Sequence, residues 1–329
     1  MTKVRVGVFG LGMMGRHHAR VLRGLEDVEV IGAFDPLGDP HRAADGLRLA
    51  RDLDELLAWD IDAAVVAVPT EDHLRVALRL AASGVHTLIE KPLAVDTPEA
   101  LQILDAFAAA GRIVAVGHIE RFNPAIRSLK RRLMDGELGT PFQIATSRQG
   151  PFPDRIRDVG VVKDLGTHDL DLTAWVADQP FDTVAARCVY RAGRSHEDLV
   201  AVVGSLTDGT VTNHLVNWLS PMKERRVIVT GERGCLVADT LTADLTFHAN
   251  ASMASEWEGL SQFRGVSEGD MIRYAIAKPE PLEVELSGFR DAVLGRDGEI
   301  VTGTDGLHAL QVAEAILRSA EHGTVEEVA

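Results

Sequence analysis

Short apolar runs alternate with amphipathic or alanine- and leucine-rich segments over the first 120 residues. The apolar runs are Val4–Phe9, Val28–Phe34, Ala63–Val68, His86–Ile89 and Ile113–Gly117. The segments Met14–Arg23, His73–Ser83 and Pro98–Ala110 between them are predicted helices, the last with Thr97 as its cap and Gly111 at its end. Apolar strands separated by helices predict a parallel sheet that is covered on both faces.

The pattern changes after residue 120. A helix is predicted at Ile126–Leu133, and several strand-like runs follow it. These runs are Ile144–Arg148, Val184–Tyr190, Leu199–Leu206, Val211–Trp218 and Val227–Thr230. Asp208-Gly209 is a strong hairpin signal between two of them. Consecutive strands that are joined by tight turns predict an antiparallel sheet.

Two helices are expected near the end of the chain, at Glu283–Leu294 and Thr304–Ser319. The second carries apolar side chains at helical spacing from Leu307 to Leu317, so one of its faces must be buried. The chain therefore reads as an α/β domain in residues 1–120, followed by an α+β domain with a mostly antiparallel sheet in residues 121–329.

Composition narrows the function classes. A chain of 329 residues is long enough for two domains. A net charge of −15 argues against binding to nucleic acid or to an anionic membrane, so an anionic ligand would need a local group of arginines. Two cysteines exclude a disulfide framework or a cysteine-rich zinc site, and no metal-ligand cluster is evident. With no apolar run of membrane-spanning length and no signal-peptide pattern, we expect a cytoplasmic protein.

A glycine-rich turn directly follows the first predicted strand. Gly10-Leu11-Gly12-Met13-Met14-Gly15 has the spacing G-x-G-x-x-G and opens a helix, an arrangement that binds the pyrophosphate of a dinucleotide. Asp35 at the end of the second strand would accept hydrogen bonds from both ribose hydroxyls and repel a 2′-phosphate. We therefore expect NAD in preference to NADP, although Arg42 lies close enough in sequence to contact a phosphate. The alternative is a glycine turn that binds no nucleotide.

Two further segments reach the same edge of the predicted sheet. Val68-Pro69-Thr70 ends the third strand and is expected at the cofactor crevice, as is His73, whose alternative role is to cap or pack there. Glu90-Lys91-Pro92 ends the fourth strand. There the Lys91 ammonium could stabilise a developing alkoxide and Glu90 would lie beside the cofactor; the alternative is a surface ion pair that the proline stiffens.

Residues 164–171 read D-L-G-T-H-D-L-D. If this segment is helical, Asp164, His168 and Asp171 share one face, and a carboxylate beside a histidine would orient its ring. A capped helix with solvent-facing polar residues is the alternative, and spacing alone does not decide between the two.

The glycine motif with Asp35, the E-K-P at 90–92 and the D-x-G-x-H-x-x-D at 164–171 together resemble the Gfo/Idh/MocA oxidoreductase family. The resemblance covers the whole chain. It implies a Rossmann domain followed by a domain with a large open sheet, through which homodimers or homotetramers form, and a final helix, about 304–319, that packs back toward the Rossmann domain. It also implies that Lys91 contacts nicotinamide and substrate, that His168 is the acid/base and that Asp164 is its partner.

Residues 117–124 and 150–161 look like the subgroup that oxidises the 3-hydroxyl of UDP-N-acetylglucosamine. Arg121, Arg155 and Arg157 could grip a diphosphate, unless they pair with the abundant carboxylates. Asn123 could contact sugar hydroxyls or an acetamido group, and Asp171 is grouped with these substrate-binding residues.

We therefore expect an NAD-dependent dehydrogenase of a sugar or nucleotide sugar. The alternatives are an inositol, polyol or free-sugar dehydrogenase and, outside enzymes, a dinucleotide-sensing regulator. The sequence leaves open the exact sugar, the carbon oxidised, the direction, the oligomer size and whether Lys91 or His168 formally takes the proton.

Overall fold

The computed structural model describes residues 3–39, 42–152, 159–251 and 268–328. The chain divides into two compact units. The first comprises Met1–Ile119 and Pro279–Gln311, and the second comprises Glu120–Lys278 and Val312–Ala329. This division differs from the expected domain ranges in one respect, because residues 279–311 group with the first unit rather than the second.

The first unit is built on a parallel sheet. Within the described residues its five strands have the order β2-β1-β3-β4-β5. Their bounds are β1 Val4–Phe9, β2 Val28–Phe34, β3 Ala63–Val66, β4 His86–Glu90 and β5 Val114–Gly117. The strand order reverses between β1 and β3, and ligands of such open sheets bind outside the carboxyl ends of the strands at that point.

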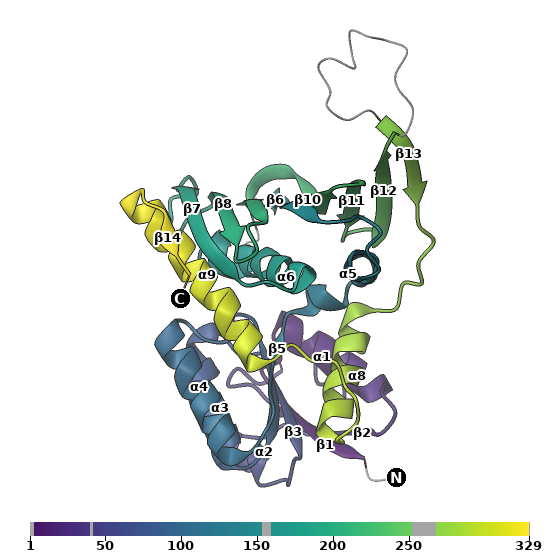
Figure 1. The fold of residues 1–329 in the computed structure, drawn as a ribbon. Coiled ribbons are helices and arrows are strands. Elements are labelled where there is room, and N and C mark those ends of the chain that lie inside the picture. The colour runs from purple at the N-terminus through teal and green to yellow at the C-terminus, as the bar shows by residue number, and fades with distance from the viewer. Residues whose placement is uncertain (1–2, 40–41, 153–158, 252–267, 329) are drawn as a thin grey trace, which may run out of the picture. The chain divides into compact units, whose positions relative to one another are not determined.

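Helices flank this sheet, with α3 and α4 on one side and α1 and α8 on the other (Figure 1). The helix bounds are α1 Met13–Gly24, α2 Leu53–Leu57, α3 His73–Ala82, α4 Thr97–Ala110 and α8 Pro281–Val293, with a 3₁₀ turn η1 at Thr70–Asp72. The cap of α4 is Asp96, whose side chain accepts from the N–H of Glu99, and not Thr97 as the sequence suggested. Gly111 ends α4 with φ of +61°, as expected for a left-handed C-terminal glycine.

Helix α8 belongs to the core of the first unit. Its side chains Leu282, Leu286 and Phe289 are buried in the same cluster as the apolar residues of β1 and α1. The sequence predicted this helix at Glu283–Leu294. It did not indicate the partner against which the helix packs, because the helix lies more than 150 residues from the sheet that it covers.

The second unit contains a larger, mostly antiparallel sheet. In the part of the chain that the structure describes, nine strands have the order β13-β12-β11-β10-β6-β9-β8-β7-β14, and β6 and β9 form its parallel pair. Their bounds are β6 Pro141–Pro151, β7 Phe181–Val189, β8 Leu199–Leu206, β9 Val211–Asn217, β10 Leu219–Gly231, β11 Gly234–Asp239, β12 Asp244–Asn250, β13 Glu268–Arg273 and β14 Glu326–Glu327. The sequence did not predict the last four of these strands.

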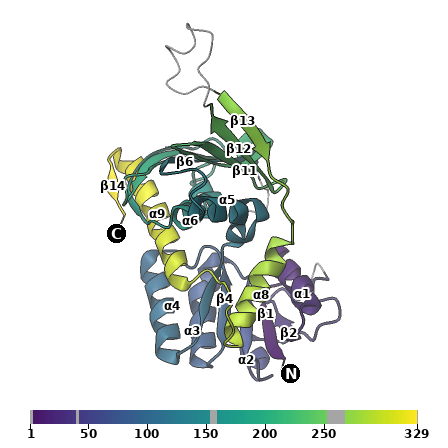
Figure 2. The same cartoon turned by 45° about the vertical axis from the view of Figure 1, so that its right-hand side comes forward.

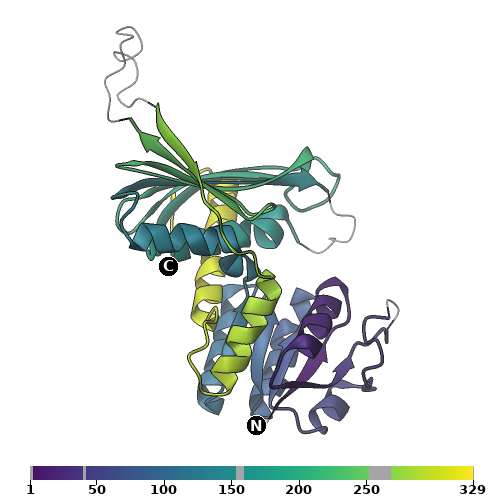
Figure 3. The same cartoon turned by 90° about the vertical axis from the view of Figure 1, so that its right-hand side faces the viewer.

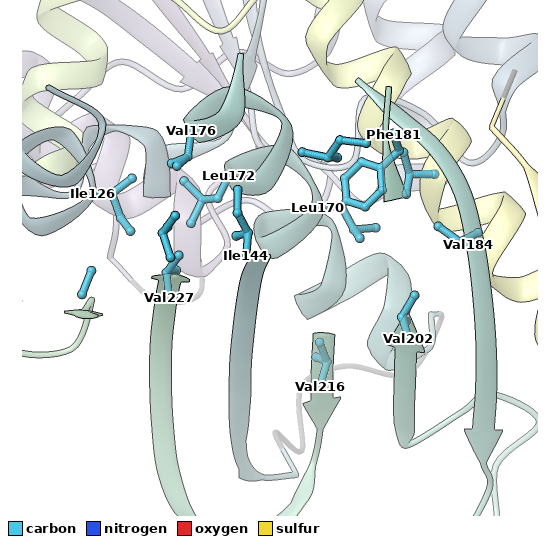
Figure 4. Packing of buried hydrophobic residues seen from close by; sticks show 14 of the residues in the cluster. Ile126, Ile144, Leu170, Leu172, Val176, Phe181, Val184, Val202, Val216 and Val227 are labelled. Carbon is cyan, nitrogen blue, oxygen red and sulfur yellow. The ribbon is translucent and has the colours of Figure 1, made fainter. Parts of the chain in front are cut away.

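Two helices, α5 (Pro124–Met134) and α6 (Thr167–Ala177), cover one face of this sheet (Figures 2 and 3). Leu170, Leu172 and Val176 of α6 pack onto side chains such as Ile144 of β6 and Val227 of β10 (Figure 4). The second half of α9 (Gly303–His322) contributes small and branched side chains to the same core. These are Val312, Ala313, Ala315 and Ile316. The opposite face of the sheet exposes apolar side chains, among them Val203, Val211 and Leu215.

The described ranges contain no helix with both the length and the apolar character that crossing a bilayer requires.

A buried chain of hydrogen bonds crosses the helix-covered face of the second unit. The hydroxyl of Thr146 donates to Asp169 Oδ2 at 3.1 Å, so its oxygen accepts from His214 Nδ1 at 2.8 Å. This fixes the proton of His214 on Nδ1. Burial lowers the pKa of the His214 imidazole from 6.5 to about 4. The ring is therefore neutral in the folded protein at pH values where it is partly charged in the unfolded chain.

We predict that His214 makes the protein less stable in mild acid. The unfolded chain binds the proton near pH 6.5 and the folded chain only near pH 4, so the contribution of His214 is complete above pH 6.5 and is lost as the pH falls toward 4. The loss in the free energy of unfolding should reach about 3 kcal/mol. Denaturant unfolding of the wild type and of His214→Asn at several pH values measures it, since asparagine retains a donor but does not titrate.

The matched control is His248→Asn, which replaces an exposed histidine of β12. It should keep the pH dependence of the wild type, while His214→Asn should flatten it between pH 6.5 and 4. Parallel curves for all three proteins would contradict the assignment.

Candidate functional site

The glycine loop between β1 and α1 approaches other backbone too closely for any side chain. Gly10 has φ of +91°, and a Cβ there would lie 2.5 Å from the carbonyl oxygen of Ala67. A Cβ at Gly15 would lie 1.9 Å from the oxygen of Gly10. Both positions therefore require glycine for packing.

Gly12 differs from the other two glycines, because a Cβ there would meet nothing within 4 Å. It is the residue before α1 and provides no side-chain cap, so the helix offers no acceptor to the N–H groups of its first turn. Open space beside free N–H groups at a helix N-terminus fits the pyrophosphate of a dinucleotide. The glycine loop therefore fits NAD as the sequence predicted.

Asp35 joins this loop to the end of β2. Its Oδ2 accepts from the N–H of Leu11 and its Oδ1 from the N–H of Leu37, both at 2.8 Å. Each carboxylate oxygen has a second lone pair, so Asp35 can still accept from ribose hydroxyls while it holds the loop. Arg42 is exposed. It is the residue that the sequence offered as a contact for the 2′-phosphate of NADP.

Glu90 is buried at the end of β4 and is hydrogen-bonded to His18 of α1. The Nε2 of His18 lies 2.7 Å from Glu90 Oε1. Burial raises the pKa of the Glu90 carboxyl, but the hydrogen bond and charge of His18 and the charge of Lys91 outweigh it, so the pKa lies below its ordinary value. Gly117 of β5 leaves room for this carboxylate, since a Cβ there would lie 3.2 Å from it.

Sequence reasoning missed His18. A possible signal was its place on α1, three residues after Gly15, where the helix must face the sheet. The pair explains why β4 continues into a glutamate: the carboxylate is part of the core and the next residue, Lys91, is partly exposed. The peptide bond between Lys91 and Pro92 is cis.

His73 takes the packing role that the sequence offered as its alternative. Its Nδ1 lies 3.0 Å from the carbonyl oxygen of Pro92, and its Nε2 lies 3.1 Å from that of Val68. Burial lowers the pKa of the imidazole, and its hydrogen bonds to carbonyls offset only part of that effect. His73 thus packs between the end of β3 and the E-K-P turn, and its ring donates to one of these carbonyls when it is neutral. The side chains of Val68, Pro69 and Thr70, just after β3, are exposed or partly exposed.

In the second unit, Asp164 and His168 lie on two different kinds of helix. Asp164 is in a π-helical turn, η3 (Val162–Gly166), whereas His168 is the second residue of α6. Asp164 is buried and His168 is partly exposed. Glu197 fixes the turn, because its Oε1 accepts from the N–H of Val162 at 2.9 Å. The segment is helical as expected, but its winding differs from that of the uniform α-helix assumed from the spacing.

Arg121 and Asp171 pair with each other. The guanidinium donates from Nε to Oδ2 at 2.8 Å and from Nη2 to Oδ1 at 2.6 Å, and both side chains are buried. This is the carboxylate pairing that the sequence left open for the arginines. Two of the expected diphosphate ligands, Arg155 and Arg157, lie outside the described residues.

Asn123 caps α5. Its Oδ1 accepts from the N–H of Ala125 at 3.1 Å, and its Nδ2 donates to the carbonyl of Thr240 at 3.0 Å. Since Pro124 occupies the first helical position, asparagine before it is a favourable cap. These two bonds give Asn123 a role in the fold beside the predicted role toward a sugar.

Arg148 of β6 is a buried cation that sequence reasoning missed. Its Nε donates to Asp169 Oδ1 at 2.7 Å, and its Nη1 donates to Glu120 Oε1 at 2.8 Å. Burial alone would lower the pKa of the guanidinium, but the charges of Asp169 and Glu120 outweigh it and raise the pKa. Within the described residues, no group of three or more histidine, cysteine or acidic side chains is arranged to hold a metal ion.

Comparison with known families agrees with this arrangement. Residues 4–118 match the model of the oxidoreductase family with an NAD-binding Rossmann fold, Gfo/Idh/MocA, and residues 126–237 match the model of its C-terminal domain. The chain belongs to this oxidoreductase family, and its first unit carries the family's NAD-binding Rossmann fold. The predicted fold class, the cofactor and the assignment to an enzyme class are thereby confirmed.

Two curated relatives match nearly the full length. The UDP-N-acetylglucosamine 3-dehydrogenase of Acidithiobacillus ferrooxidans is 30% identical over 95% of this chain and 96% of its own. An inositol 2-dehydrogenase of Saccharopolyspora erythraea is 28% identical over 99% of this chain and 95% of its own. A solved structure of the first enzyme covers 98% of this chain and 99% of its own, with a TM-score of 0.82.

We predict that Asp35→Ala weakens NAD binding by about 10- to 100-fold, the loss expected for hydrogen bonds to a charged group. It should also reduce the preference for NAD over NADP, because no carboxylate would then repel a 2′-phosphate. Steady-state kinetics with both cofactors measure this. Asp39→Ala is the matched control, since Asp39 also accepts backbone N–H groups, those of Ala43 and Ala44 in the segment that follows β2. An unchanged cofactor preference in Asp35→Ala would count against the ribose role.

Proposed function

We propose that this oxidoreductase is an NAD-dependent dehydrogenase that oxidises a secondary hydroxyl of a sugar carried on UDP, with the 3-hydroxyl of UDP-N-acetylglucosamine as the substrate group. The observation that carries this proposal is the 30% identity, over nearly the full length of both chains, with an enzyme named for that reaction. The intact E-K-P segment at 90–92 and the intact Asp164 and His168 support a catalytically competent chain.

Bound NAD would supply the hydride acceptor for the carbon that carries the hydroxyl. In this proposal, His168 removes the hydroxyl proton and Asp164 orients its imidazole. The ammonium of Lys91 stabilises the negative charge that builds on the oxygen. The pair of His18 and Glu90 holds the residue before Lys91 in the core, which limits the positions that Lys91 can take.

An inositol or free-sugar dehydrogenase is the second candidate. The full-length similarity to an inositol 2-dehydrogenase favours it, and so does the pairing of Arg121 with Asp171. That pairing occupies one of the three arginines that the sequence offered to a diphosphate. The two candidates share the roles of Lys91 and His168, so only the substrate separates them.

We further propose that the chain forms a homodimer or homotetramer through the sheet face of the second unit that α5 and α6 leave uncovered. Exposed Val203, Val211 and Leu215 on β8 and β9 support this, because an apolar sheet face is a surface that oligomers bury.

The test of the substrate is NADH formation with UDP-N-acetylglucosamine, free N-acetylglucosamine and myo-inositol, each with and without added UDP. We expect turnover of the UDP-sugar and competitive inhibition by UDP. Turnover of myo-inositol that UDP leaves unaffected would instead establish the second candidate. The absence of turnover with every sugar of the panel would remove the proposal.

We predict that Lys91→Ala and His168→Ala each lower kcat by about 100- to 10,000-fold, the range for loss of a positioned acid or base. Both variants should still bind NAD, which titration of the cofactor by fluorescence checks. His248→Ala, which removes an exposed histidine, is the control and should retain full turnover. Near-normal kcat in both variants would discredit the assignment of these two residues.

A further inference from the structure

Two arginines lie side by side on the helix-covered face of the sheet in the second unit. Arg148 of β6 and Arg225 of β10 are register partners in the antiparallel pair. Side chains alternate between the two faces of a strand, so Arg225 lies on the same face as Val227 and Val229, which are buried in the core. Arg226, the next residue, lies on the opposite face.

The two cations differ in how their charge is balanced. Arg148 donates to two buried or half-buried carboxylates, those of Asp169 and Glu120. Arg225 donates from Nη1 to the carbonyl oxygens of Gln149 at 2.8 Å and Glu224 at 2.9 Å. Among the residues that the structure describes, no carboxylate lies within ion-pair distance of Arg225.

The surroundings make this imbalance costly. Burial lowers the pKa of the Arg225 guanidinium, and the charge of Arg148 lowers it further. The more distant charges of Asp169, Glu120 and Asp164 act in the opposite direction and do not restore it. A half-buried cation beside a second cation is stabilised when an anion binds next to it.

The free edge of the guanidinium has the right geometry for an anion. Both carbonyl bonds use Nη1, which leaves Nε and Nη2 without a partner among the described residues. Neither atom is a buried polar atom cut off from solvent. Two parallel N–H donors of this kind match the two oxygens of a phosphate or carboxylate.

We propose that Arg225 binds an oxyanion of the substrate, either a phosphate of a nucleoside diphosphate or the carboxylate of a sugar acid. This inference rests on the proposed function, because it assigns a substrate contact to the same site, and it adds a specificity-determining residue in the second unit. Asp164 lies close enough to act on the charge of Arg225, so the anion would bind near the predicted acid/base residues.

A purely structural role is the competing explanation. The β6–β10 pairing has an irregularity between Leu219 and Glu224, and the bond from Arg225 to the carbonyl of Gln149 links the two strands just beyond it. A structural role explains the two hydrogen bonds of Nη1. It does not require that Nε and Nη2 bind anything. It predicts that loss of Arg225 lowers stability but leaves the affinity for anions unchanged in the folded protein.

The experiment measures binding of UDP and of D-glucuronate by calorimetry, in the presence of NADH, to the wild type, Arg225→Gln and Arg226→Gln. Arg226 is the matched control, because it is the adjacent arginine on the other face and is 54% exposed. We expect Arg225→Gln to bind one of the two ligands about 10- to 100-fold more weakly, because charge-assisted hydrogen bonds are lost. Arg226→Gln should stay within about threefold of the wild type.

Weakened UDP binding identifies a diphosphate, and weakened glucuronate binding identifies a carboxylate. Equal binding by wild type and Arg225→Gln, or no binding of either ligand to the wild type, overturns the proposal. If Arg225→Gln does not fold, Arg225→Lys decides: it keeps the charge but loses the two-pronged geometry, so unchanged affinity in that variant also overturns it.

The result is separable from the test of the proposed function. Arg225-dependent UDP binding without turnover of UDP-N-acetylglucosamine would refute the substrate assignment and leave this inference standing. Turnover of the UDP-sugar with the same KM in wild type and Arg225→Gln would support the substrate assignment and refute the role of Arg225.

Discussion

The close approach of the glycine loop to the end of β3 is the contact on which the cofactor site of the first unit depends. A side chain at Gly10 would overlap the backbone of Ala67, so the loop can cross there only as bare backbone. That crossing places the N-terminus of α1 at the carboxyl edge of the sheet, where Asp35 ties it to β2. His73 then packs between the same edge and the E-K-P turn.

Buried charge imposes the corresponding constraint on the second unit. Leaving one partner of a buried ion pair unpaired costs about 3–5 kcal/mol, so buried arginines take carboxylates from within the fold before any ligand does. Arg121 takes Asp171, and Arg148 takes Asp169 and Glu120. The arginine that this internal pairing leaves without a carboxylate is therefore the one that is available to bind a substrate.

The local pattern of the chain was sufficient for much of the fold. The predicted bounds of β1, β2 and β8 coincide with those in the structure, because their apolar runs end at clear turn signals. Strand β13 was missed because all of its residues are exposed, so it has no apolar alternation to detect. The placement of α8 was missed because its partners are distant in sequence.

The candidate site was predictable to the extent that its residues belong to contiguous motifs. Glu90 and Lys91 were found from the motif, whereas His18 was not, because its partner is 72 residues away. The role of Asn123 in the fold was not predicted either, because the acceptor of its Nδ2 is 117 residues further along the chain. Pairings of this range follow from the topology of the sheets, which spacing in the sequence does not contain.

The net charge of −15 bears on how an anionic substrate would be held. Repulsion by the acidic surface is largely screened beyond about 8 Å at physiological ionic strength. A guanidinium at about 4 Å from an oxyanion, with an effective dielectric constant of about 20, is attracted by about 4 kcal/mol. One partly desolvated arginine at contact distance therefore outweighs many exposed carboxylates further away. A neutral sugar would gain nothing from this attraction, so the charge state of the substrate is a property that a single residue such as Arg225 can select.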